Sequence, residues 1–185
     1  MKSSEATILV LPGLGGGTDG HWYARWQAGL RTAEMVDLDD WSHPTRETYA
    51  EAIATAVAGS VRPVVLVGHG YGSLAAVHAA SGLTGGKVRG AFLAAVPDVE
   101  SAGAHGVAET YRPLPRDPLP FPSLVLASRN DPQCDFAVAE DLAGAWGSRL
   151  VDLRESGNVD PDSGHGPWPE GLMTFGKFLS QLGAA

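Results

Sequence analysis

The sequence contains little cysteine, little positive charge and no long hydrophobic run. A single cysteine among 185 residues, Cys134, excludes an internal disulfide framework. No apolar stretch approaches the roughly eighteen residues needed to cross a membrane, and residues 1–5 do not resemble a signal peptide. We therefore expect a cytoplasmic protein that has no membrane partner.

Acidic residues outnumber basic ones, with 21 Asp and Glu against 13 Lys and Arg and a formal net charge of −8. This balance argues against a nucleic-acid partner. Hydrophobic residues make up 44% of the chain, which indicates one folded domain over residues 1–185. No Cys/His spacing suggests a metal site, so we expect no metal and no cofactor. A small molecule is the expected partner, and the oligomeric state is left open.

Short apolar runs alternate with amphipathic stretches along the whole chain. Strands are expected at residues 7–11, 35–38, 64–67, 88–96, 123–127 and 150–153. Helices are expected at about 21–31, 45–60, from 72 onward, 136–146 and 170–182. This alternation predicts a six-stranded, mainly parallel, doubly wound sheet with helices on both faces. The long proline-rich connection at 97–122 is expected to form a lid or pocket wall.

The segment 68–72 reads Gly-His-Gly-Tyr-Gly and lies between a buried strand and a helix. That is the strand–turn–helix context of the nucleophile elbow, G-x-S-x-G. Gly70 stands where the serine belongs. Glycine adopts the strained turn without steric cost but offers no hydroxyl. A phosphate-binding turn is the weaker alternative, because neither G-x-G-x-x-G nor G-K-[ST] is present.

With these motifs, the chain resembles the small serine hydrolases of the retinoblastoma-binding protein 9 and YdeN type. The matching stretches are residues 21–26, 40–44, 97–100, 121–125, 128–132, 145–150, 162–164 and 168–171. The resemblance implies a minimal α/β-hydrolase fold with esterase-like activity. It also implies a triad of nucleophile, acid and histidine, whose positions fall here on Gly70, Asp131 and Asn158. Because two of these three residues are replaced, ordinary serine hydrolysis is not expected.

The oxyanion hole of this fold does not depend on the replaced side chains. It uses the backbone N–H after the nucleophile, here Tyr71, and one from the first loop, here Leu14. The helix that begins near Gly72 directs its positive end at the same point. The site therefore keeps the means to hold a carbonyl, enolate or carboxylate oxygen.

Three residues are candidates for replacement catalytic chemistry: Asp131, His165 and Asp19. His165 follows in the same loop as the replaced histidine and is either an alternative imidazole or an exposed loop residue. Asp19, in the first loop, is a candidate acid–base group. His21 and Trp22 are candidate ligand-binding residues. A structural role at the start of the helix is favoured for His21, and a place in the aromatic core is equally open for Trp22.

These observations favour a repurposed, non-hydrolytic enzyme of the cyclase, lyase or isomerase type. It would act on a carbonyl-bearing small molecule held in the old oxyanion hole. One alternative is a catalytically dead small-molecule-binding protein. Another is a serine esterase inactivated at Gly70, with His165 as its base. An enzyme must place an acid–base group within reach of the reacting atom, whereas a carrier needs only a complementary shape.

Overall fold

The computed structural model describes residues 1–16, 20–101 and 103–182. The strands are β1 (Thr7–Leu11), β2 (Ala33–Met35), β3 (Val64–His69), β4 (Val88–Ala94), β5 (Ser123–Ala127) and β6 (Arg149–Asp152). The helices are α1 (Trp22–Gly29), α2 (Arg46–Gly59), α3 (Tyr71–Ala79), α4 (Val107–Thr110), α5 (Phe136–Ala145) and α6 (Pro169–Leu182), with short 3-10 turns at Ser3–Glu5 and Ala80–Gly82. The strand order within these residues is β2-β1-β3-β4-β5-β6, and every pairing is parallel. The predicted doubly wound sheet is confirmed, and it is wholly rather than mainly parallel.

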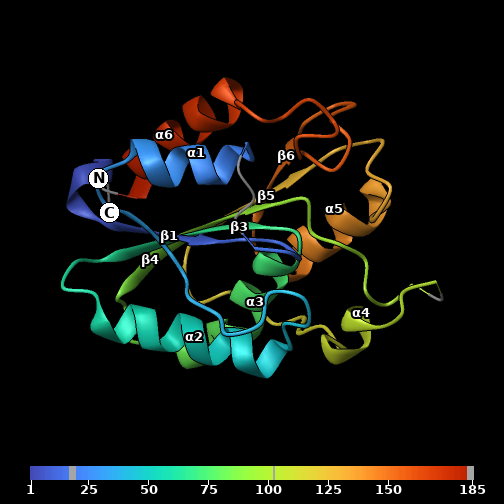
Figure 1. The fold of residues 1–185 in the computed structure, drawn as a ribbon, viewed down its shortest axis with the longest axis horizontal. Helices are drawn as coiled ribbons and strands as arrows, with labels where there is room; N and C mark the ends of the chain where they lie inside the picture. The colour runs from blue at the N-terminus through green and yellow to red at the C-terminus, as the bar shows by residue number, and fades with distance from the viewer. Residues whose placement is uncertain (17–19, 102, 183–185) are drawn as a thin grey trace.

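The sheet forms the middle of three layers (Figure 1). Helices α1 and α6 cover one face, while α2, α3 and α5 pack against the other. Strands β1, β3 and β5 are buried at every position, which explains why the sequence reads there as continuous apolar runs. Within the described residues, no helix has the length and apolar character needed to span a membrane.

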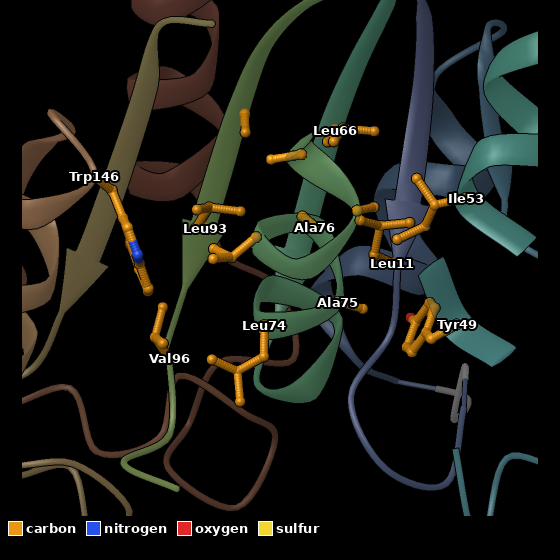
Figure 2. Close-up of a cluster of buried hydrophobic side chains, with 14 of the residues drawn as sticks. Leu11, Tyr49, Ile53, Leu66, Leu74, Ala75, Ala76, Leu93, Val96 and Trp146 are labelled. Carbon is orange, nitrogen blue, oxygen red and sulfur yellow. The ribbon is translucent and has the colours of Figure 1, made fainter. Parts of the chain in front are cut away.

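Two large hydrophobic cores lie on the two faces of the sheet. Helix α3 lies at the centre of the first core, on the face covered by α2, α3 and α5 (Figure 2). Its Leu74 is fully buried, as are Leu66 of β3 and Leu93 of β4 in the same cluster. Ile53 of α2 and Trp146 beyond α5 close the two sides of that cluster. Burial of side chains of this size stabilises the fold by about 1.5–3 kcal/mol each. The helix that follows the glycine turn is therefore held firmly against the sheet.

The second core is aromatic and joins α1 to α6. The ring of Trp26 lies 4.7 Å from Trp22 and 5.4 Å from Phe175, measured between centroids, and Trp22 lies 5.0 Å from Trp168. The indole N–H of Trp22 donates to the Val159 carbonyl at 2.9 Å. This bond anchors the loop after β6 to the start of α1, so both segments are fixed near the end of β1.

Two predicted strands need correction. The second was expected at 35–38 but pairs at Ala33–Met35, because the ladder with β1 begins at Ala33. Val36 still donates its N–H to Val10, and its side chain turns into the core. The fourth strand ends before the expected residue 96, since Ala95 has a φ of 49° that takes the chain out of the extended conformation.

The long connection at 97–122 contains one short helix, α4, among its described residues. The guanidinium of Arg112 donates to the carbonyls of Val99, Ser101 and Ala104. These bonds join the first half of the connection to the segment that follows α4. That half lines a cavity of about 350 Å³, which agrees with the expected pocket wall.

Candidate active site

Gly70 forms the turn between β3 and α3. Its φ of 55° and ψ of −123° lie in a region that residues with a side chain rarely adopt. Its N–H donates to the Ala94 carbonyl at 3.0 Å, and its own carbonyl accepts from Ser73 and Leu74. A Cβ built at this position meets only the Cα of Gly13, at 3.8 Å. Glycine is therefore favoured here by backbone conformation and not by lack of space.

The flanking glycines are required for a different reason. A Cβ at Gly68 would lie 2.7 Å from the Cα of Ser73, and a Cβ at Gly72 would lie 2.0 Å from the Leu11 carbonyl oxygen. Both positions allow the helix to approach the sheet closely. Ser73 is fully buried and donates to the Ala94 carbonyl at 3.0 Å, so its hydroxyl is directed into the core. The turn keeps the geometry of a nucleophile elbow.

A cavity of about 400 Å³ opens at this turn, beyond the carboxyl ends of β1 and β3. The strand order reverses between these two strands, and parallel sheets bind ligands at such points. The residues that line the cavity are Gly13, Leu14, His21, Tyr23, His69, Gly70, Tyr71, Gln133, Asn158, Asp160, Pro161 and Asp162. The structure thus brings together five residues singled out from the sequence: Leu14, His21, Gly70, Tyr71 and Asn158.

The other sequence candidates lie elsewhere. Trp22 is fully buried in the aromatic core, and Asp131 does not line the cavity. His165 also lies outside the lining: its Nδ1 is 3.3 Å from the Ser163 hydroxyl, and its ring packs edge-on against Trp168. The expected role of Asp19 falls outside the described residues. A catalytic role for His165 would require a different loop arrangement.

Two buried histidines form the inner wall of the cavity. His21 is only 4% exposed; its ring stacks on Tyr23 at 3.7 Å and lies 4.6 Å from the ring of His69. Burial, reinforced by the neighbouring His69, lowers the pKa of His21 to about 3. Burial also lowers the pKa of His69, whose Nε2–H donates to the Asn158 carbonyl at 2.8 Å. Both rings are therefore neutral at pH 7, and His69 ties the elbow to the loop after β6.

Two carboxyl groups near the cavity have pKa values displaced in opposite directions. Burial works against the charge of Asp160, but hydrogen bonds from the Asn158 side chain and from Ser163 hold its pKa below the ordinary value. Burial raises the pKa of Asp131 to about 6 against the effect of the Gln133 N–H, and the charge of Asp160 raises it further. Of these two carboxyl groups only Asp160 lines the cavity.

Asp160 and Asp162 are the functional candidates that sequence reasoning did not single out. Both lie within residues 157–164, the segment that the family resemblance had assigned to the histidine position. The signal was present in the two carboxylates themselves, which lie in the polar loop after the strand predicted at 150–153. Gln133 was missed as well, two residues beyond Asp131, and it lines the cavity from the loop after β5.

Neither a metal site nor a reactive thiol is found in the part of the chain that the structure describes. No group of three or more His, Cys, Asp or Glu side chains there is arranged to hold an ion. Burial raises the pKa of the Cys134 thiol to about 12, so this residue is not a thiolate nucleophile. Any chemistry of the described cavity rests on its carboxylates, histidines, tyrosines and backbone amides.

The parallel sheet, the elbow after its central strand and the cavity at the strand ends define an α/β-hydrolase fold. A family model described as serine hydrolase matches residues 8–177. The chain therefore belongs to this serine hydrolase family, as the sequence resemblance indicated. Among curated proteins, none matches the sequence.

Solved structures place the chain in the same group. A protein described as a YdeN-like hydrolase from Pectobacterium atrosepticum is 30% identical, with a TM-score of 0.87 and coverage of 97% of this chain and 94% of that one. The ydeN gene product of B. subtilis shares 16% identity, a TM-score of 0.75 and coverage of 95% and 99%. The RedJ thioesterase of Streptomyces coelicolor shares 17% identity, a TM-score of 0.66 and coverage of 97% and 92%. The last two likenesses concern the fold alone.

Proposed function

We propose that this protein is an enzyme that acts on a carbonyl-bearing small molecule without forming a covalent serine intermediate. The observation that carries the proposal is the composition of the cavity around Gly70. Its described lining contains no serine, threonine or cysteine, yet it places a hydrogen-bonded carboxylate, Asp160, in the same cavity as the elbow. Acyl transfer needs an attacking side chain, whereas proton transfer needs only a base and a site for negative charge.

Two backbone amides supply that site for negative charge in the proposal. Tyr71 is the first residue of α3, so no carbonyl one helical turn earlier is available to its N–H. The amide of Leu14 has no hydrogen-bond partner within the described residues, and both residues line the cavity. The positive end of α3 adds to their effect. Together they support an oxyanion hole like that of the family, formed without the lost side chains.

In the proposed reaction, Asp160 removes a proton from the carbon next to the substrate carbonyl. The electron pair of that C–H bond forms a carbon–carbon double bond, and the carbonyl electrons move onto oxygen as an enolate. The amides of Leu14 and Tyr71 hold the enolate oxygen. Return of the proton to another atom gives an isomerase. Expulsion of a leaving group gives a lyase, and attack of the enolate on a second carbonyl gives a cyclase.

Hydrolysis by an activated water is the second candidate, and family membership favours it. In that reaction Asp160 would take a proton from water, which would attack the carbonyl carbon in place of a serine. A serine esterase inactivated at Gly70 has less support, because His165 lies outside the cavity lining. A binding protein without catalysis would need the cavity but not the ionised carboxylate.

Deuterium exchange tests the proposal directly. Small ketones and aldehydes are incubated with the protein in D₂O, and loss of the α-proton signal is followed by NMR. We expect exchange above background with the wild type and none with Asp160→Asn. The control is Asp141→Asn, which removes a carboxylate from an exposed pair with Arg116. Hydrolysis of activated esters that depends on Asp160 would favour the water-based hydrolase, and a cavity that binds these compounds without any exchange would favour the carrier.

A further inference from the structure

The hydrogen-bond donors at the elbow and the acceptors of the cavity come from different segments of the chain. At the elbow the donors are the backbone amides of Leu14 and Tyr71, at the ends of β1 and β3. The Gln133 amide and the Tyr71 hydroxyl also line the cavity and can each donate or accept. The side-chain groups contributed by the loop after β6 are acceptors. A ligand that satisfies both sets must present an acceptor to the elbow and a donor to that loop.

Asn158 shows how strongly the loop after β6 is biased towards acceptors. Its side-chain N–H₂ already donates to Asp160 at 2.9 Å, and its Oδ1 is buried without any hydrogen-bond partner. Asp160 and Asp162 add two carboxylates beside it. Because this oxygen is itself buried, the acceptors of the loop that a ligand can reach are the carboxylates of Asp160 and Asp162.

The inner wall adds no positive charge to balance these acceptors. No lysine or arginine occurs among the described lining residues. His69 donates Nε2–H to a backbone carbonyl, so its Nδ1 is an acceptor in the neutral ring. His21 is 4% exposed and lines the cavity, and its Nδ1 has no partner. An anionic ligand would therefore meet carboxylates and neutral rings, with no positively charged side chain of the described lining in its favour.

We infer that the cavity selects a neutral or cationic carbonyl compound whose carbonyl carbon carries an N–H donor, such as an amide, and that it excludes carboxylates. The carbonyl oxygen accepts from the amides of Leu14 and Tyr71, and the N–H group donates to the carboxylate of Asp160. This inference rests on the proposed function because it places the substrate carbonyl at the same two amides. It concerns binding alone, so it can fail while the proposed chemistry holds.

A matched set of small aromatic probes tests the inference. Benzamide offers a carbonyl and an N–H donor, acetophenone replaces the amino group by methyl, and benzoate replaces it by a charged oxygen. Dissociation constants are measured by NMR titration at pH 7.5. We expect benzamide to bind about tenfold or more tightly than acetophenone, and benzoate to bind most weakly, as for one hydrogen bond to a charged acceptor.

Two variants test which carboxylate causes the preference for benzamide over acetophenone and benzoate. Asp160→Asn should bring benzamide and acetophenone close together and improve benzoate binding. Asp162→Asn should improve benzoate binding without disturbing the loop, because no hydrogen bond to the Asp162 side chain is recorded among the described residues. Asp141→Asn, outside the cavity, should change none of the three constants. Benzoate binding as tight as benzamide binding, or failure of benzamide to bind at its solubility limit, would overturn the inference whatever the outcome of the exchange assay.

Discussion

Replacing Asp131 by asparagine should stabilise the protein at neutral pH. The Asp131 carboxyl is partly buried, and its pKa is raised from 3.8 to about 6, chiefly by that burial. Its Oδ1 accepts from the Gln133 N–H at 2.9 Å, a bond that the asparagine oxygen can keep. No basic side chain is recorded as its partner among the described residues. The negative charge is therefore unfavourable in the folded state.

The sign and the pH range follow from proton binding. Because the folded pKa lies above the unfolded one, the native state binds the proton more tightly between pH 3.8 and about 6. Proton binding to Asp131 therefore stabilises the folded protein fully below pH 3.8. This stabilisation weakens as the pH rises from 3.8 to about 6 and is lost above pH 6. A displacement of this size corresponds to about 3 kcal/mol for a fully buried group, and partial exposure reduces it to about 1–2 kcal/mol.

Urea unfolding followed by the fluorescence of the five tryptophans measures this effect at pH 4, 6 and 8. We expect Asp131→Asn to raise the free energy of unfolding at pH 8 by about 1–2 kcal/mol and to change it little at pH 4. Asp141→Asn changes the net charge equally at an exposed site and should stay within about 0.5 kcal/mol at every pH. Destabilisation of Asp131→Asn at pH 8 would mean that the carboxylate has a favourable partner, and the reasoning above would be wrong.

Three further outcomes are expected. Gly70→Ser should fold and lose about 1–3 kcal/mol, because only its φ is unfavourable, whereas Gly72→Ser, whose Cβ would lie 2.0 Å from a backbone oxygen, should not fold stably. Gly70→Ser combined with Asn158→His should hydrolyse p-nitrophenyl acetate faster than Gly70→Ser alone, since a serine needs an adjacent base; equal rates would refute this. His21→Phe should reduce the loss of stability on acidification by up to about 1.4 kcal/mol per pH unit below pH 6.5. The reason is that a histidine whose folded pKa is lowered stabilises the protein only above its unfolded pKa. Urea unfolding at pH 4, 5 and 7 measures the effect.

The sheet was predictable from the sequence because its central strands are buried on both faces. Mostly apolar runs at 7–11, 64–67 and 123–127 leave few other possibilities for a chain of this length. The start of the edge strand β2 was predicted two residues late. Val36 is apolar because it packs in the core after the strand has ended, and periodicity does not distinguish such a residue from a paired one.

The site was predictable only in part: the sequence predicts where its backbone groups lie, but not how the side chains of its loops are arranged. Gly70, Tyr71 and Leu14 follow from the order of strand, turn and helix, which fixes their positions at the strand ends. The role of Asp160 depends on which way a polar loop folds, and in particular on the Asn158 amide that reaches it at 2.9 Å. Sequence spacing carries no information about that choice.

The family resemblance suggests that Gly70 and Asn158 stand where a serine and a histidine would be, and we propose that these two replacements are physically connected. An imidazole at residue 158 would accept the proton of a serine at the elbow, and Asp131 would orient that imidazole. With asparagine there, the amide turns to Asp160 and supports its charge, while Asp131 is left with a partly buried carboxyl and a raised pKa. In this proposal the ionised carboxylate that serves the elbow comes from the loop after β6, because Asp160 lines the cavity and Asp131 does not. Restoring serine and histidine alone should therefore give slow hydrolysis, because the loop would still be arranged around Asp160.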